Sequence, residues 1–344
     1  MEVTSVAITG ASGLVGERLL AALAARDDVD RIVGLDVREP RRRFPGLEFH
    51  VVDVASAELK PVLEDIEVVV HLAAVVDPIP DEALMERVNV EGTRRVLDAA
   101  TSGAAKLIRV SPTSVYGAWA NNPVPLTEDA PLRPNPDFSP AEHAAEVERL
   151  LYEWSDQHPS VAVTVLRAAP VVGPGAARMP SRLLLGHPPL RVRGAAPPVQ
   201  ALHVDDLVAA LVLAVTADLP GTFNVAPDGW VTAEDTAALV GRTVVPPLPA
   251  EVLQRALART WASGVGDVPP GVVPYLVHPL VVANDRLRSA GWVPAHTNEE
   301  ALVAGLDALA PSERSKVALA LTLGGAAAIV LGIGAGWLLR RRRH

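Results

Sequence analysis

Cysteine is absent from this 344-residue chain. Disulfide bonds, thiolate nucleophiles and cysteine metal ligands are therefore excluded, and the composition agrees with a protein that folds in a reducing compartment. The first ten residues also lack the basic segment and apolar core of a secretory signal peptide. We therefore expect the folded part of the chain to stay in the cytoplasm.

Lysine and tyrosine are almost as scarce, with three residues of each. No tyrosine is followed by lysine four positions later, where the residues are Ala120, Asp156 and Pro279. Helix positions i and i+4 share one face, so a tyrosine activated by a lysine on the same helix needs that spacing. The sequence excludes such a proton-transfer pair.

Positive charge is also limited. The formal net charge is −9, and four of the 31 basic residues are Arg340–Arg343 at the end of the chain. Binding to nucleic-acid phosphates needs clustered lysine and arginine, so no nucleic-acid partner is expected. The run Arg41–Arg43 lies between two prolines and is interpreted as a solvated loop, with contact to a ligand phosphate as the alternative.

A long apolar stretch is present near the C-terminus. Residues 317–339 are 23 consecutive uncharged residues between Lys316 and Arg340. As a helix they would be about 34 Å long, and a bilayer core is about 30 Å thick. The stretch has no polar stripe, and Trp337 and the terminal arginines suit a membrane interface. We predict a single-pass C-terminal membrane anchor; a buried terminal helix and an interfacial helix are the alternatives.

The orientation of this anchor rests on two opposing signals. The terminal arginines favour the cytoplasm, but a folded domain without an export signal should also remain there. We give the domain precedence and predict a cytoplasmic domain tethered to the cell membrane. Small residues recur every fourth position at Gly324, Ala328, Gly332 and Gly336, a pattern that can pack two helices together.

Strand-like and helix-like segments alternate through the first half of the chain. Short runs rich in Val and Ile occupy residues 3–10, 30–37, 47–54, 65–74, 105–117 and 161–173. Amphipathic stretches between them include 15–26, 84–101 and 141–157. This alternation predicts an α/β fold with a doubly wound parallel sheet of the Rossmann type.

The second half is less regular. Residues 176–200 are rich in Pro and Arg and are predicted to be irregular, and 203–226 supply a further helix and strand that return to the sheet. We assign 1–175 to a dinucleotide-binding domain and 176–310 to a smaller α+β lobe. A short linker at 311–316 then precedes the apolar stretch and the basic tail 340–344.

A glycine-rich turn follows the first predicted strand. Gly10, Gly13 and Gly16 lie between that strand and an amphipathic helix, where glycine lets the backbone approach a pyrophosphate at the helix N-terminus. Asp36 ends the second strand 20 residues after Gly16. A carboxylate there can accept both hydroxyls of an adenosine ribose and repels a 2′-phosphate, so NAD is predicted over NADP. Asp53 follows the third strand in the same way.

Several motifs occur in order: TGASGLVG, HLAA, VNVEGT, VSPTSVYG, LRAAPVVGPG and HVDDLVAAL. Together they resemble the extended short-chain dehydrogenase/reductase family, the NAD-dependent epimerases and dehydratases, over roughly residues 3–310. The resemblance implies a cofactor site made of Gly10, Ser12, Gly13, Leu14, Val15, Gly16, Asp36, Asp53, Val54, Ala73 and Ala74. It also implies that Asn89 supports this site and that 176–200 and His203 border the substrate.

Enzymes of this family use a Ser or Thr, a Tyr and a Lys for proton transfer. The corresponding positions here are Pro112, Pro140 and Ala144, and none of these side chains can carry a proton. The substitute candidates are Thr113, beside the lost hydroxyl, and His143, which shares part of the helix face. An exposed histidine without a catalytic role is the alternative reading of His143.

Two further expectations depend on the resemblance. His203, Asp205 and Asp206 could suggest a metal, but acids at a helix start cap backbone amides, so no metal site is predicted. Dimers of the family use a helix pair beside the active site, and 82–100 with 141–156 could provide one, so a homodimer is an open expectation.

The leading functional hypothesis is a membrane-anchored NAD-binding protein without the family's usual catalysis, acting as a cofactor sensor or scaffold. One alternative is an atypical oxidoreductase or epimerase acting on a sugar-nucleotide or lipid-linked substrate through a different proton donor. Another is a structural protein that no longer binds a nucleotide. Loss of one positioned acid or base slows a reaction step by about 10²–10⁴.

Overall fold

The computed structural model describes residues 3–101, 103–176, 179–185, 190–240 and 247–308. Its centre is a seven-stranded sheet in the order β3-β2-β1-β4-β5-β6-β9, and every neighbouring pair is parallel. The strands are β1 (Val3–Thr9), β2 (Val29–Asp36), β3 (Leu47–Val51), β4 (Val68–His71), β5 (Lys106–Pro112), β6 (Ala162–Ala168) and β9 (Gly221–Val225). The predicted doubly wound parallel sheet is confirmed.

The central strands form because both of their faces are covered. All four residues of β4 are buried, as are most residues of β5 and β6. Continuous runs of Val, Ile and Leu are typical of parallel strands with helices on both sides. The strand order reverses beside β1, which pairs with β2 on one side and β4 on the other. Open α/β sheets bind ligands at such a point, outside the carboxyl ends of the strands.

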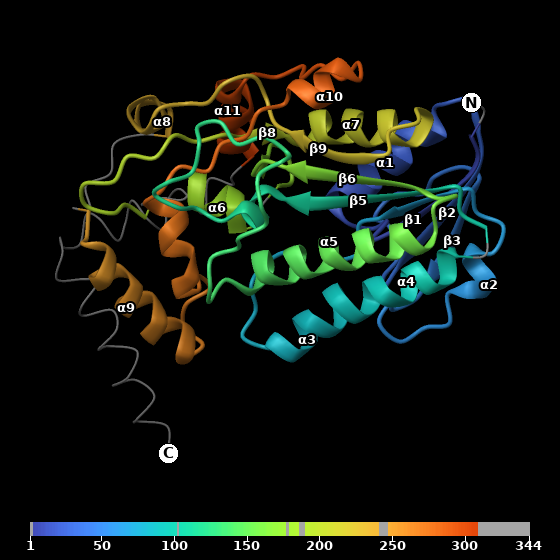
Figure 1. Ribbon diagram of the computed structural model, residues 1–344, viewed down its shortest axis with the longest axis horizontal. Coiled ribbons are helices and arrows are strands. Elements are labelled where there is room, and N and C mark those ends of the chain that lie inside the picture. The colour runs from blue at the N-terminus through green and yellow to red at the C-terminus, as the bar shows by residue number, and fades with distance from the viewer. Residues whose placement is uncertain (1–2, 102, 177–178, 186–189, 241–246, 309–344) are drawn as a thin grey trace.

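Two helical layers enclose the sheet (Figure 1). One layer contains α1 (Leu14–Ala24) and α7 (Val204–Thr216), which contact each other. The other contains α4 (Gly92–Ala100) and α5 (Ser139–Gln157), with the shorter α2 (Lys60–Leu63), α3 (Glu82–Glu86) and π-helix η1 (Arg87–Glu91). Each layer buries its own apolar cluster against the sheet. The helices predicted at 15–26, 84–101 and 141–157 are all present, although 84–101 is divided into three, and 203–226 contains the predicted helix and strand, α7 and β9.

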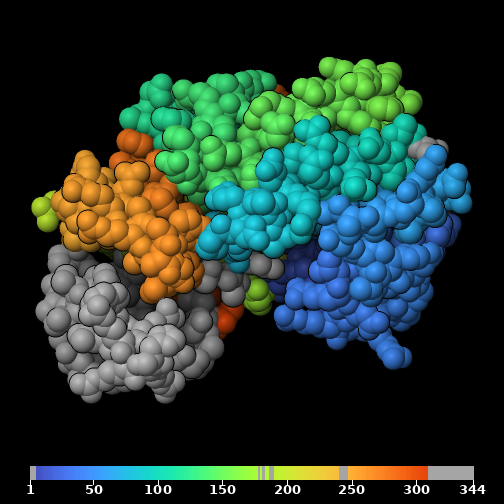
Figure 2. Space-filling view, turned by 90° about the horizontal axis from the view of Figure 1, so that it is seen from below, coloured from blue at the N-terminus to red at the C-terminus, as the bar shows by residue number. Residues whose placement is uncertain are grey.

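The smaller lobe lies at the carboxyl end of the sheet. It contains β7 (Val171–Val172), β8 (Leu202–His203), α6 (Met179–Leu185), α8 (Ala233–Val240), α9 (Ala250–Ala262), 3₁₀-helix η3 (Pro270–Leu276), α10 (Asp285–Ser289) and α11 (Asn298–Ala308). In Figure 2 the orange surface of this lobe borders the cyan and green surface of α3 to α5. The lobe is built from several small apolar clusters.

The prediction that 176–200 is irregular is wrong in one part, because α6 lies inside this range. Leu185 at the end of α6 packs against Gly305 of α11, where an added methyl group would lie 2.5 Å from a leucine methyl carbon. Helix α6 is therefore supported by a contact across more than one hundred residues, which local sequence does not reveal.

The predicted membrane anchor at 317–339 lies outside the described residues, as do the whole linker 311–316 and the basic tail. Within the described ranges, the structure contains no helix that is both long and apolar enough to span a bilayer.

Candidate functional site

The turn after β1 is shaped for close backbone approach. Gly10 has a φ of +71°, and a methyl group added there would lie 2.7 Å from the nitrogen of Ala73. A methyl group at Gly16 would overlap the carbonyl oxygen of Gly10. Gly13 is the N-cap of α1, and within the described residues no side chain caps this helix. The first-turn amides, beginning with Leu14 and Val15, can therefore bind a negatively charged group.

Asp36 at the end of β2 is held by the same turn. Its Oδ2 accepts a hydrogen bond from the Ser12 amide at 2.9 Å, and the Ser12 hydroxyl donates to the carbonyl of Arg38 at 2.6 Å. The Asp36 side chain is half-buried rather than covered. This arrangement fixes one carboxylate oxygen beside the glycine turn, so Gly10, Ser12, Gly13 and Asp36 form one compact site.

Asp53 and Val54 lie further along the same edge of the sheet. The Asp53 carboxylate accepts from the amide of Ala55 at 2.9 Å and closes the turn that follows β3. Val54 is buried and packs against Gly92 of α4. The backbone joins this turn to the site, because the amide of Val52 donates to the carbonyl of Asp36 at 2.8 Å.

A chain of buried hydrogen bonds supports the segment after β4. The Ala73 amide donates to Thr9 Oγ1 at 3.2 Å, and this hydroxyl lies 2.7 Å from His71 Nδ1. His71 Nε2 lies 3.0 Å from Thr93 Oγ1, which donates to the carbonyl of Asn89 at 2.6 Å. Since Thr93 donates its proton to the Asn89 carbonyl, His71 must donate from Nε2. In a neutral ring Nδ1 then accepts from the Thr9 hydroxyl, which gives all these hydrogen bonds one direction.

The surroundings of His71 favour the neutral ring. Burial lowers the pKa of His71 well below its ordinary value, and the positive charge of Arg109 lowers it further. Arg109 donates to the His71 carbonyl at 3.0 Å, and burial lowers the pKa of this arginine to about 10. Asn89 bridges the amide and carbonyl of Val75 with its side-chain amide, and thereby holds the loop that contains Ala73 and Ala74. It lies in π-helix η1, an element frequent at functional sites.

The three positions that the resemblance assigns to proton transfer lie at the end of β5 and in the first two turns of α5. Pro112 ends β5 and is exposed, Pro140 lies in the first turn of α5, and Ala144 lies one turn later. Thr113 does not continue the strand. It opens 3₁₀-helix η2 (Thr113–Tyr116), and only 4% of it is exposed.

His143 belongs to a different part of the α5 surface. At 3.6 residues per turn its side chain leaves the helix about 60° from position 140 and about 100° from position 144. Val147 and Trp154 lie on the same side of α5 and belong to the apolar cluster shared with α4. His143 Nδ1 is buried and has no hydrogen-bond partner in the described part of the chain.

A buried ion pair behind the site was missed by the sequence reasoning. Arg167 on β6 donates to Glu148 on α5 at 2.6 Å and to the hydroxyl of Tyr116 at 2.8 Å. Glu148 holds the pKa of Arg167 above its ordinary value despite burial, whereas burial raises the pKa of Tyr116 to about 12. Tyr116 is therefore a fixed hydrogen-bonding group and not an acid or base near neutral pH. The available signal was a Glu on the apolar face of α5 and an Arg within an apolar strand.

His203, Asp205 and Asp206 also differ from expectation. The N-cap acceptor of α7 is His203 Nδ1, 3.3 Å from the Asp205 amide, and Asp205 itself pairs with Arg18. Asp206 is buried and accepts from the backbone amides of Ala295 and His296 instead of capping its own helix. The acids therefore join α7 to α1 and to the segment before α11.

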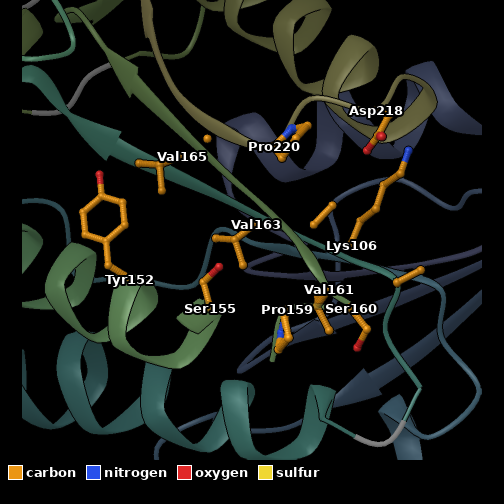
Figure 3. A pocket seen from close by; sticks show the side chains of 13 residues that line it. Lys106, Tyr152, Ser155, Pro159, Ser160, Val161, Val163, Val165, Asp218 and Pro220 are labelled. Atoms are coloured by element: carbon orange, nitrogen blue, oxygen red, sulfur yellow. The ribbon is translucent and has the colours of Figure 1, made fainter. Parts of the chain in front are cut away.

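A separate cavity of about 560 Å³ lies at the amino ends of β5, β6 and β9 (Figure 3). Valines of β6 form its floor, with Tyr152 and Ser155 of α5 along one side and Lys106 near Asp218 at the far end. The Lys106 ammonium donates to the carbonyl of Ala217 at 2.7 Å, and burial lowers its pKa. Because the strands are parallel, this cavity is at the opposite end of the sheet from the glycine turn.

The parallel sheet and the glycine turn at its switch point define a doubly wound α/β protein of the Rossmann class. Residues 6–226 match the NAD dependent epimerase/dehydratase family, and the chain belongs to this family. The resemblance found in the sequence is thus confirmed, and the family description agrees with NAD as the cofactor.

The relatives differ in what their names describe. A 3-diazoavenalumate denitrifying reductase from a Streptomyces species is 32% identical over 85% of this chain and 96% of its own length. An uncharacterised protein of Mycobacterium tuberculosis is 27% identical over 86% of this chain and 81% of its own. The solved UDP-glucose 4-epimerase of Thermus thermophilus in complex with NAD has a TM-score of 0.69 at 21% identity, covering 89% of this chain and 98% of that one. This last similarity is one of fold.

Proposed function

We propose that the chain binds NAD across the carboxyl ends of β1, β2 and β4. The observation that carries the proposal is the tight glycine turn at the switch point of the sheet, where methyl groups on Gly10 and Gly16 would overlap the backbone of Ala73 and of Gly10. The uncapped amides of α1 beside it suit a pyrophosphate, and the half-buried Asp36 suits a ribose diol. The residues present therefore fit a dinucleotide.

Each part of the site has a distinct task in this proposal. The turn Gly10–Gly16 and the first residues of α1 hold the pyrophosphate, while Asp36 accepts from the adenosine ribose and repels a 2′-phosphate. Asp53 and Val54 border the adenine, and Ala73 and Ala74 line the path toward β5. When bound, NAD supplies a nicotinamide ring that can exchange hydride.

We propose further that the chain lacks the proton transfer of its family and acts as a cofactor sensor or scaffold. Pro112, Pro140 and Ala144 occupy the three positions that the resemblance assigns to proton transfer. Tyr116, the tyrosine nearest to these positions in the sequence, is held by a hydrogen bond from Arg167. The apolar stretch 317–339 supports the proposal that this activity takes place at the cytoplasmic face of the cell membrane, as a monomer or a homodimer.

The test is a fluorescence titration of the full-length protein with NADH. Saturable binding is expected, and Asp36→Ala should weaken it about 10- to 100-fold, because hydrogen bonds to a charged group contribute about 1.5–3 kcal/mol. Asp98→Ala, which removes an exposed carboxylate from α4, is the matched control and should bind as the native chain does. A folded chain without saturable NADH binding would favour the purely structural alternative.

An atypical reductase is the second candidate, favoured by the similarity to the denitrifying reductase over almost its whole length. The other form of this candidate is an oxidoreductase or epimerase that acts on a sugar-nucleotide or lipid-linked substrate. His143 is the titratable group nearest the lost positions in the sequence, so turnover that survives His143→Ala excludes it as the proton donor. Absence of turnover with diazo, carbonyl and sugar-nucleotide substrates would count against every enzymatic reading.

A further inference from the structure

Two histidines from distant parts of the chain stack on each other. The ring centroids of His203 and His296 are 3.8 Å apart and the rings are inclined by 24°. His203 ends β8 and is 5% exposed, whereas His296 lies before α11 and about a third of its side chain is exposed. Such close contact favours at least one neutral ring, because two imidazolium rings at this distance repel each other.

Charged groups face the pair from two elements, α7 and α1. Asp206 of α7 lies 3.1 Å from His296 Nδ1, so one positive ring can be compensated. Asp205 lies 3.7 Å from His203 Nδ1, but this carboxylate is also bound at 3.1 Å by Arg18 of α1. Burial and the neighbouring His296 lower the pKa of His203, an effect that Arg18 adds to and the two aspartates oppose.

The stack supports the loop at residues 173–175. A methyl group added to Gly173 would lie 3.0 Å from His203 Nε2, so this ring packs directly against the loop backbone. The same loop contacts the start of α1: a methyl group on Gly175 would lie 2.9 Å from a methyl carbon of Leu14. Arg18 donates to the carbonyl of Pro174 at 2.7 Å. The loop therefore connects the histidine pair with the helix terminus proposed to hold the pyrophosphate.

We propose that His203 and His296 form a pH-sensitive latch that keeps loop 173–175 seated on α1, so that affinity for NAD falls as the pair gains protons. This inference rests on the proposed function, because it takes the start of α1 as the pyrophosphate site. One proton is tolerated, since Asp206 faces His296. A second proton charges both rings, separates them and releases the support behind Gly173.

The experiment measures NAD⁺ binding to the full-length protein by isothermal titration calorimetry between pH 5.5 and 8.5. The native chain should lose about tenfold in affinity over this range, the effect of a difference of about one pKa unit between free and bound protein. His296→Phe retains a ring in the stack but cannot take a proton, and it should bind with nearly constant affinity. His158→Phe, at the stacked Trp154–His158 pair after α5, is the matched control and should keep the native slope.

His203→Gln provides a second variant that removes the buried partner, and circular dichroism verifies that each variant is folded. Native affinity that does not change with pH overturns the latch, as does an unchanged slope in both His296→Phe and His203→Gln. Failure of the proposed function is distinguishable, because it appears as no NAD⁺ binding by the native chain at any pH.

Discussion

Glu148 and Arg167 have side-chain exposures of 0% and 3%, so each depends on the other for charge compensation. Removing one member of a buried pair leaves an unpaired charge in the interior. We expect Glu148→Ala to lower the free energy of unfolding by about 3–5 kcal/mol, measured by urea denaturation. Glu146→Ala on the same helix breaks an exposed pair with Arg149 and should cost about 0–1 kcal/mol. Equal losses in the two variants would contradict this assignment.

His71 provides a residue-scale prediction about pH. Its pKa in the folded protein is lowered, so the unfolded chain binds more protons at acidic pH. The contribution of His71 to stability is therefore complete above about pH 6.5 and decreases as the pH falls from there toward its folded pKa. Urea unfolding between pH 5 and 7.5 should show this decrease, with a slope of up to about 1.4 kcal/mol per pH unit from one histidine.

His71→Gln should remove this part of the slope, while His278→Gln, at a half-buried histidine of the smaller lobe, serves as the control. If the native slope between pH 5 and 6.5 persists in His71→Gln, the proton is taken up elsewhere.

At the scale of residues, the sequence indicated which residues belong to the candidate site better than it indicated which residues contact one another. The spacing of Gly10, Gly16 and Asp36 identified the candidate site because a strand, a turn and a helix suffice to constrain it. The partner of Asp206 could not be predicted, because Ala295 is 89 residues away and the contact depends on how the smaller lobe folds back. Pairing across lobes has no local sequence signal.

Helix α5 carries two of the three positions that the resemblance assigns to proton transfer. Positions 140 and 144 are one turn apart and both are half-buried, so side chains added there should meet on one face. In Pro140→Tyr/Ala144→Lys, the ammonium should lower the pKa of the new phenol by about 1–3 units relative to Pro140→Tyr alone. Proline in a first helical turn donates no required hydrogen bond, so its replacement should leave α5 intact.

Ultraviolet absorbance of tyrosinate measures this difference. Two of the three native tyrosines interfere little, because burial raises the pKa of Tyr116 to about 12 and raises that of Tyr275 as well. The third, Tyr152, is present in both variants, so its absorbance cancels in the comparison. Adding Lys at position 142 instead of 144 is the matched control and should have a smaller effect, because position 142 leaves the helix about 200° from position 140 and faces away from it. An equal shift from both positions would mean that 140 and 144 do not share a face.

Helices and strands with a strong local sequence pattern were predicted, whereas those that depend on distant contacts were missed. Strands such as β4 and β6 were predictable because short valine-rich apolar runs are typical of strands buried on both faces of a parallel sheet. Helix α6 was not, since its support comes from α11. The interruption of 84–101 by η1 was also missed, because a π-helix differs from an α-helix only in hydrogen-bond spacing and has no composition of its own.

For the whole molecule, the sheet and its layers could be derived from the alternation of segments, but the packing of 176–308 could not. This region consists of short helices joined by proline-rich loops, and its clusters draw on residues far apart, as in the contact of Phe138 with Tyr275 at 5.0 Å. The part of the candidate site beside α5 is therefore bordered by a surface that forms only when the smaller lobe has folded.

The apolar stretch 317–339 leads to the prediction that involves the complete chain. If it spans a bilayer, the full-length protein should float with liposomes in a density gradient. The double variant Ala328→Arg/Ile329→Arg should stay in the soluble fraction, because each arginine at the centre of a spanning helix costs about 2.5–3.5 kcal/mol.

Ala328→Leu/Ile329→Leu alters the same positions without charge and should float as the native chain does. NADH titration of all three proteins separates anchoring from binding: equal affinity is expected, because the proposed NAD site is formed by β1, β2, β4 and α1. A native chain that fails to float, or an arginine variant that floats equally well, would contradict a spanning anchor.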